Sequence, residues 1–243
     1  MNSSRLPGKV LLDICGLPVL VHVVRRVQKA ENVDKVILAT SNTCSDDSLE
    51  QCCIQNNIKC FRGSENDVLD RFYKAVQWAG AKEEDYVVRI TADCPFIDAE
   101  VIDLVVETAI ETKYDYVSNT IKPTYPDGLD VEVFTVDALK KAWENANLQS
   151  EREHVTPFLY KHPELFKIQN IECESDYSGL RWTLDESEDF EVINNVYNEL
   201  YKKDSFFKMK DILKLNKSRP EIFTKNIKFK RNEGYEKSIL QDG

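Results

Sequence analysis

The segment Y-V-V-R-I-T-A-D-C-P, residues 86–95, contains the clearest strand of the chain and decides its fold class. Its β-branched residues are typical of a buried strand, and Asp93 follows directly beyond the carboxyl end of that strand. Asp98 then begins a helix that we expect to run through Glu111. A strand that leads straight into a helix is the unit from which α/β folds are built.

The same alternation extends along the chain in both directions. Periodicity predicts helices over residues 18–30, 45–57, 66–79, 98–111, 136–146, 150–161 and 186–202. It predicts strands over residues 35–40, 58–61, 86–91, 115–118, 129–135, 166–171 and 180–184. We therefore expect a three-layer α/β fold with a mixed, mostly parallel sheet. One domain should span residues 1–203, followed over 204–243 by a C-terminal helix and a polar, lysine-rich arm.

The start of the chain departs from this scheme. A nucleotide-binding α/β domain normally opens on a strand, whereas residues 1–4 here are a loop, M-N-S-S. We expect the first strand to be missing from the sequence as given, so that a central position of the sheet is empty or otherwise filled.

Composition excludes several classes of protein. The 243 residues carry a net charge of −10, which argues against a general binder of nucleic acid or of anionic membranes. No apolar run approaches the roughly 20 residues that a membrane span needs. The seven cysteines show no paired spacing, so we predict reduced thiols in a cytoplasmic protein.

Three elements of the sequence could carry chemistry together. In S-R-L-P-G-K, residues 4–9, Arg5 and Lys9 bracket a turn where Gly8 lets backbone N–H groups approach an oxyanion. Asp93 and Asp185 each lie just past a predicted strand, where ligands gather in open α/β sheets. A solvated loop and two helix-capping aspartates are the alternatives. Taken together, the three elements predict a phosphate site with Mg²⁺ held by the two carboxylates.

Two further groups are less specific. In Y-P-D-G-L-D-V-E-V-F, residues 125–134, Asp130 and Glu132 share one face of a predicted strand, with Asp127 in the turn before it. Buried together, such carboxylates need hydroxyls, cations or donors, whereas an exposed edge strand would leave them in solvent. His154 could transfer a proton or lie on a helix surface. With three histidines in the chain, a histidine-rich metal site is not credible.

Several segments, taken in order, resemble one family. They are S-S-R-L-P-G-K-V-L, F-R-G-S-E-N-D-V-L-D-R-F, V-V-R-I-T-A-D-C-P-F-I-D, Y-P-D-G-L-D-V-E-V-F, S-E-R-E-H-V-T-P and L-R-W-T-L-D-E-S-E-D-F-E. Over residues 1–203 the chain resembles the CMP-sugar synthetases, which include the acylneuraminate and Kdo cytidylyltransferases. It looks most like the branch named for spore-coat polysaccharide biosynthesis. The family pattern has a strand and an Ala-Arg pair before the point where Met1 stands here.

The resemblance implies a Rossmann-like nucleotide-diphospho-sugar transferase fold, Mg²⁺ dependence and often a homodimer. Carried over by position, Arg5 and Lys9 match phosphate-contacting cations, and Asp93 and Asp185 match metal-binding acids. Nucleotide-binding positions would be Ser4, Gly8 and Arg71.

The reaction implied is attack of a sugar hydroxyl on the α-phosphorus of CTP, with release of pyrophosphate. The resemblance implies an acidic sugar for surface polysaccharide synthesis as the substrate. This sugar would contact some of Tyr125, Asp127, Asp130, Glu132, His154 and Arg181. Arg181 could clamp its carboxylate. Two alternatives stay open: a glycosyltransferase of related fold, and a catalytically impaired relative that serves in binding or assembly.

Overall fold

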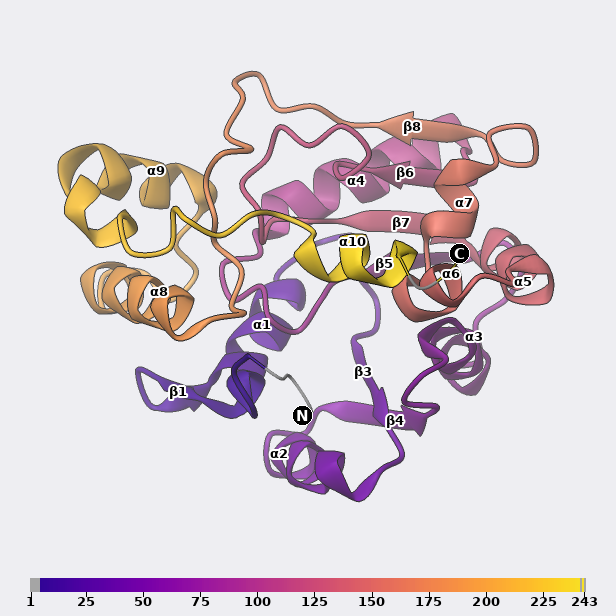
Figure 1. The fold of residues 1–243 in the computed structure, drawn as a ribbon, viewed down its shortest axis with the longest axis horizontal. Helices are drawn as coiled ribbons and strands as arrows, with labels where there is room; N and C mark the ends of the chain where they lie inside the picture. The colour runs from indigo at the N-terminus through magenta and orange to yellow at the C-terminus, as the bar shows by residue number, and fades with distance from the viewer. Residues whose placement is uncertain (1–4, 241, 243) are drawn as a thin grey trace.

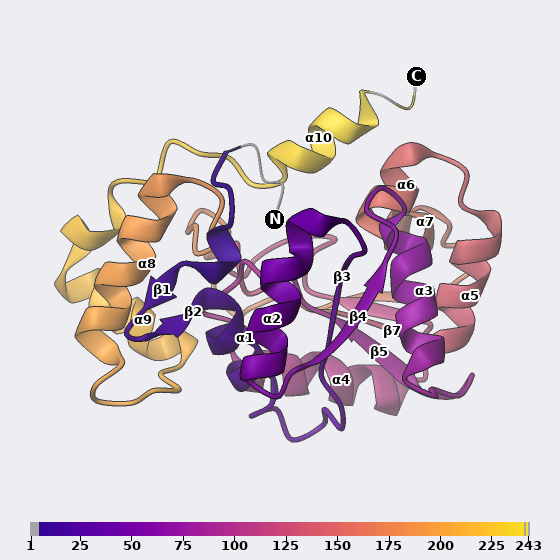
Figure 2. The same cartoon turned by 90° about the horizontal axis from the view of Figure 1, so that it is seen from below.

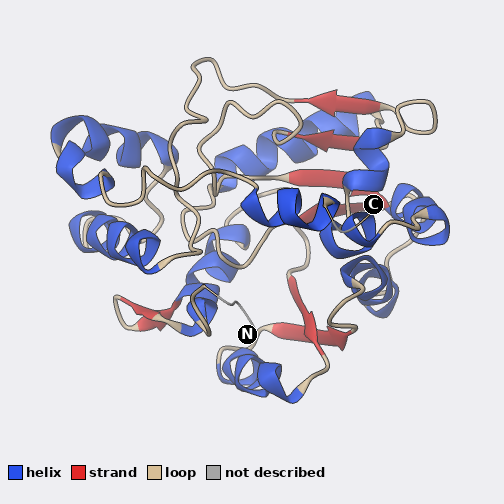
Figure 3. Ribbon diagram, in the orientation of Figure 1, coloured by secondary structure: helices blue, strands red, loops and turns tan. Residues whose placement is uncertain are grey.

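A computed structural model describes residues 5–240 and 242, so Ser4 lies outside the described residues. Its main sheet has four strands in the order β5-β7-β6-β8 (Figure 3). Their bounds are β5 Tyr86–Arg89, β7 Glu132–Thr135, β6 Tyr116–Ser118 and β8 Ile168–Asn170. Strand β7 runs antiparallel to both β5 and β6, whereas β8 runs parallel to β6. The sheet is therefore mixed, as the sequence predicts, but it is not mostly parallel, because two of its three strand pairings are antiparallel.

Two smaller ladders complete the strands. Strands β3 (Ile37–Ser41) and β4 (Lys59–Gly63) pair in parallel, and β1 (Asp13–Ile14) and β2 (Leu17–Pro18) form a short antiparallel hairpin. Among residues 5–240 and 242, no strand joins β3 to β5, so the β3-β4 pair is separate from the four-stranded sheet.

The helices surround the sheet (Figure 1). They are α1 Val19–Val27, α2 Asp47–Gln55, α3 Val68–Trp78, α4 Ala99–Thr112, α5 Val136–Asn145, α6 Gln149–His154, α7 Pro157–Lys161, α8 Ser187–Leu200, α9 Met209–Ser218 and α10 Glu233–Ile239. Short 3-10 turns are η1 Lys9–Leu11, η2 Cys44–Asp46 and η3 Pro220–Phe223. None of the helices in the described ranges is long and apolar enough to cross a membrane.

The core explains why the fold has three layers. Along β6 and β7, Val117 and Val133 face one apolar cluster, to which α1, α4 and α8 contribute. The alternate residues Tyr116 and Phe134 face a second cluster, to which α3, α5 and α7 contribute. Because successive strand residues point to opposite faces, each face of the sheet is covered by its own layer of helices.

Two predicted elements differ in the structure. The predicted helix 150–161 is two helices, because Val155 takes a φ of 74° and Pro157 begins α7. Proline lacks an N–H and disfavours helical backbone before it, so it starts a helix more readily than it continues one. The predicted strand 180–184 is wrong, since its only ladder contact is the single bridge between Asp127 and Arg181. Its alternation reflects burial of Trp182 and Leu184 instead.

The C-terminal region packs on the domain and then crosses it. Helix α9 buries Ile212 and Leu215 in the main core. Beyond η3 the chain returns over the molecule, and α10 lies beside α6 at the far end (Figures 1 and 2). The predicted arm therefore lies over the domain from which it emerges.

Candidate active site

Lys9 is the centre of a cluster built from three distant parts of the chain. Gly8 takes a φ of 69°, a conformation that suits glycine, and the turn η1 that follows it begins with Lys9. The Lys9 Nζ donates to Asp93 Oδ2 at 2.6 Å and to Asp185 Oδ1 at 2.7 Å. The fold thus brings together the loop cation and both strand-end carboxylates that the sequence singles out.

The capping alternatives for the two aspartates do not apply. Helix α4 is capped by Asp98, whose side chain accepts from the Glu100 N–H, so Asp93 has no such task. At the start of α8, Asp189 accepts from the backbone N–H groups of Asp185 and Glu186 at 3.0 and 2.9 Å. The side chains of Asp93 and Asp185 are therefore available to cations.

Charge and burial are coupled at this cluster. Burial lowers the pKa of Lys9, but the carboxylates of Asp93 and Asp185 outweigh it, so the pKa lies above its ordinary value. For Asp93, burial raises the pKa, yet the Lys9 ammonium holds it below the usual range. Lys9 and Asp93 are therefore both charged at neutral pH.

Arg5 adds a second cation to the same carboxylate. Its guanidinium lies 3.1 Å from Asp185 Oδ1 and 3.1 Å from Glu186 Oε1. The Arg5 side chain keeps 32% of its surface exposed, so an incoming anion can reach it. Two cations at one solvent-accessible carboxylate pair suit a polyphosphate that arrives together with a metal ion.

Arg181 holds the acidic residues in place. Its guanidinium bonds to Asp189 at 2.9 Å, to Asp127 at 3.2 Å and to Asp185 at 3.1 Å. Burial lowers its pKa, but the Asp189 carboxylate leads the groups that raise it above the ordinary value. In this arrangement each guanidinium nitrogen has a partner. The structure therefore favours a positioning role over the expected clamp on a sugar carboxylate.

The remaining sugar-side residues form two groups. Asp130 forms an ion pair with Arg231, which also donates to the Tyr125 carbonyl at 3.1 Å. His154 Nε2 lies 2.9 Å from Ser238 Oγ, and burial lowers the pKa of the imidazole. Both Arg231 and Ser238 belong to the C-terminal arm.

Two predicted residues, Glu132 and Arg71, have partners outside the Lys9 cluster. Glu132 is buried between Arg89, with which it forms an ion pair, and the Tyr116 hydroxyl, which donates to it at 2.7 Å. Arg71 donates to the carbonyls of Ser64 and Glu65, at 2.5 and 3.4 Å, and thereby holds the loop before α3. Neither set of contacts includes Lys9, Asp93 or Asp185.

Sequence reasoning missed Asp189 and Arg231. Asp189 is fully buried and organises Arg181 and the start of α8, although the run E-S-E-D suggested only helix capping. Arg231 stands in a lysine-rich tail with weak periodicity, and nothing local marks the basic residue that returns to the site. For Asp189, its place four residues after Asp185 could have signalled a shared arginine partner.

The cluster fits Mg²⁺. Asp93 and Asp185 each place a carboxylate oxygen within 2.7 Å of one cationic atom, Lys9 Nζ. Mg²⁺ usually binds one or two protein carboxylates and takes its other ligands from phosphates and water. The described residues include no group of three or more acidic, histidine or cysteine side chains that could hold a metal ion.

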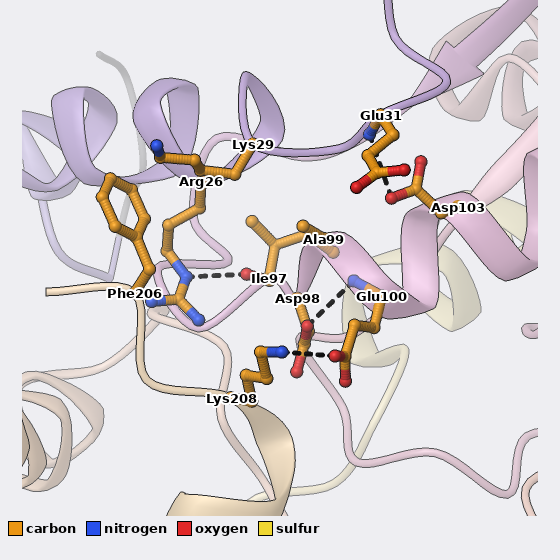
Figure 4. Close-up of a pocket in the computed structure, with 10 residues that line it drawn as sticks. All are labelled: Arg26, Lys29, Glu31, Ile97, Asp98, Ala99, Glu100, Asp103, Phe206 and Lys208. Atoms are coloured by element: carbon orange, nitrogen blue, oxygen red, sulfur yellow. Dashed lines mark hydrogen bonds and ion pairs between the residues drawn. The ribbon is translucent and has the colours of Figure 1, made fainter. Parts of the chain in front are cut away.

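A separate pocket of about 250 Å³ lies between α1, the start of α4 and the segment before α9 (Figure 4). The buried Arg26 crosses it, donating to the carbonyls of Ile97 at 2.7 Å and Phe207 at 2.6 Å. Lys208 pairs with Glu100 at its mouth. None of the candidate site residues lines this pocket, and its polar groups serve to join α1, α4 and α9.

Asp127 gives the site a pH-dependent stability. Burial and the nearby Asp130 raise its pKa to about 7, whereas an unfolded aspartate titrates near 3.9. Between these values the folded state binds more protons, so the free energy of unfolding falls as pH rises from about 4 to 7. Asp127→Asn should remove this fall and, above pH 8, exceed the wild type in stability by at least about 1 kcal/mol. Urea denaturation across pH 4–9 measures the free energy of unfolding of the wild type and of Asp127→Asn. Identical pH profiles of the two proteins would contradict the raised pKa of Asp127.

The chain is similar to known cytidylyltransferases. Residues 1–235 match the cytidylyltransferase family. Over 206 residues the chain is 41% identical to an uncharacterized protein of Methanocaldococcus jannaschii, covering 83% of this chain and 79% of the relative. It is 34% identical over 208 residues to the Bacillus subtilis spore coat polysaccharide biosynthesis protein SpsF, covering 82% and 83%. The structure of a cytidylyltransferase from Leptospira borgpetersenii superposes with a TM-score of 0.86 at 30% identity, covering 92% of each chain. The chain belongs to the cytidylyltransferase family.

Proposed function

We propose that this cytidylyltransferase transfers CMP from CTP to a sugar hydroxyl and releases pyrophosphate, so that the product is a CMP-sugar. The observation that carries the proposal is the cluster in which Lys9 contacts Asp93 and Asp185 while Arg5 contacts Asp185. A triphosphate needs such cations, and a metal that accompanies it needs such carboxylates. The spore coat polysaccharide relative supports a sugar as the acceptor.

In the proposed reaction the sugar oxygen forms a bond to the α-phosphorus as the bond to the departing pyrophosphate breaks. Asp93 and Asp185 would hold Mg²⁺, which neutralises the charge that builds on phosphate oxygens. Lys9 and Arg5 would stabilise the departing pyrophosphate. Arg181 keeps Asp127 and Asp185 in place, and Asp127 and Asp130 offer carboxylate oxygens to sugar hydroxyls.

The experiment is a matrix of four nucleotides against a panel of sugars, with pyrophosphate release as the readout. CTP, UTP, ATP and GTP are each combined with 3-deoxy-manno-octulosonate, N-acetylneuraminate and neutral sugars, with and without Mg²⁺. We expect release that requires CTP, a sugar and Mg²⁺ together. Consumption of a CMP-sugar without pyrophosphate release would indicate the glycosyltransferase alternative, and no turnover of any nucleotide would indicate the impaired relative.

The homodimer is part of the proposal, and light scattering would test it.

A further inference from the structure

Residues 230–240, which we call the strap, include α10 and pass in front of the main sheet in the view of Figure 1. Arg231 forms the ion pair with Asp130 and donates to the Tyr125 carbonyl at 3.1 Å. Ser238 Oγ lies 2.9 Å from His154 Nε2, and the Tyr235 ring packs edge-on against the His154 ring at 5.0 Å. The strap thus contacts Tyr125, Asp130 and His154, which are predicted to bind the sugar.

The strap also reaches the phosphate side. Glu233 Oε2 lies 3.7 Å from the Arg5 guanidinium, and the Lys230 carbonyl accepts from Arg181 at 3.2 Å. The view in Figure 2 shows the strap as the outermost layer on this side of the molecule. Its side chains present a guanidinium to Asp130, a hydroxyl to His154 and a carboxylate to Arg5. A sugar hydroxyl could donate to Asp130 in place of the guanidinium, and further hydroxyls and an anionic group of the sugar could replace the strap's contacts with His154 and Arg5.

The strap is held by polar contacts, whereas the segment before it is held by apolar burial. Ile222 and Phe223 are buried in the main core, and Asn226 is buried against the Arg181 carbonyl and Asp189. Within the strap, Ile239 is 42% exposed and Leu240 82% exposed, whereas the Tyr235 ring packs against His154. Partly exposed ion pairs contribute little, about 1 kcal/mol or less each, and salt screens them. The strap can therefore leave while residues 220–226 stay docked.

We infer that the strap is an autoinhibitory segment: it occupies the hydrogen-bonding positions of the sugar and must leave before the sugar binds. The identity of the competing ligand rests on the proposed function, whereas the docking and release of the strap do not. When a binding-competent state is only partly populated, the apparent dissociation constant rises by the inverse of that fraction. A strap docked nine-tenths of the time raises the apparent KM for the sugar about tenfold.

The test compares two full-length variants. Arg231→Gln/Glu233→Gln/Ser238→Ala removes the three side-chain contacts of the strap with Asp130, Arg5 and His154. Glu236→Gln/Lys237→Gln is the matched control, because these exposed residues lie on the same helix and their loss also leaves the net charge unchanged. The strap variant should lower the KM for the sugar about 5- to 10-fold. The KM for CTP should also fall, because the strap no longer holds Arg5 through Glu233. The control should match the wild type in both.

Hydrogen–deuterium exchange of residues 231–240 gives a readout that needs no turnover. In the wild type and the control, these amides should be protected at low salt and should lose protection in 0.5 M NaCl. In the strap variant they should exchange fast at both salt concentrations. Equal exchange in all three proteins would overturn the docking. A higher sugar KM or a lower kcat in the strap variant would overturn autoinhibition and show that the strap helps to bind the sugar. If no sugar is turned over by any variant, the proposed function fails while exchange still decides the docking.

Discussion

Asp93→Asn and Asp185→Asn are each expected to lower kcat by about 100-fold or more at saturating CTP and Mg²⁺. Asparagine keeps the shape of the side chain but removes the negative charge that would hold the proposed metal, and a metal contributes several kcal/mol to such transition states. The Asp93 and Asp185 carboxylates both contact the Lys9 ammonium, so we expect both to be needed and neither to replace the other. The measurement is the initial rate of pyrophosphate release.

A thermal readout separates metal binding from general damage. CTP with Mg²⁺ should raise the melting temperature of the wild type above the value with CTP alone, and each variant should lose that increment. Asp137→Asn is a suitable control, because Asp137 pairs with Lys141 on the exposed surface of α5. Near-normal rates in both Asn variants at saturating Mg²⁺ would remove these residues from the metal site.

The sequence contained enough to predict the layers and the two acids. Strand-end aspartates are local features: Asp93 follows a β-branched run and Asp185 follows an alternating one. Residues 181–184 form no strand and pair through a single bridge, yet all four are buried, and this burial positions Asp185. The structure therefore places Asp185 beside Lys9 although the predicted strand before it is wrong.

Long-range pairing was not available from the sequence. Nothing in the spacing of Lys9 shows that one ammonium will contact acids 84 and 176 residues away, because that requires the order of strands. The docking of Arg231 on Asp130 is of the same kind. The break before Pro157 was different: proline marks it locally, and the amphipathic pattern of 150–161 concealed it.

Lys9→Ala is expected to weaken transition-state stabilisation by about 2–4 kcal/mol, which corresponds to a loss of about 30- to 1000-fold in kcat/KM for CTP. The ammonium is held by two carboxylates in a partly buried site, so it is preorganised for the charge of the departing pyrophosphate. Lys9→Arg keeps the charge and should recover part of the loss. Lys122→Ala, which removes a lysine from an exposed pair with Glu172, should leave the rate unchanged.

Lys9→Ala should increase the rise in melting temperature that Mg²⁺ causes with CTP, whereas Asp93→Asn and Asp185→Asn should abolish it. Without Lys9, the buried Asp93 carboxyl loses the charge that opposes the effect of burial, so its pKa rises and the unliganded protein is less stable near neutral pH. Mg²⁺ with CTP supplies a cation to the same carboxylates, so it should raise the melting temperature of Lys9→Ala more than that of the wild type. A defect confined to the KM for the sugar, with normal handling of CTP, would place Lys9 outside the phosphate site. An equal Mg²⁺ increment in both proteins would show that Lys9 and the metal do not share the two carboxylates.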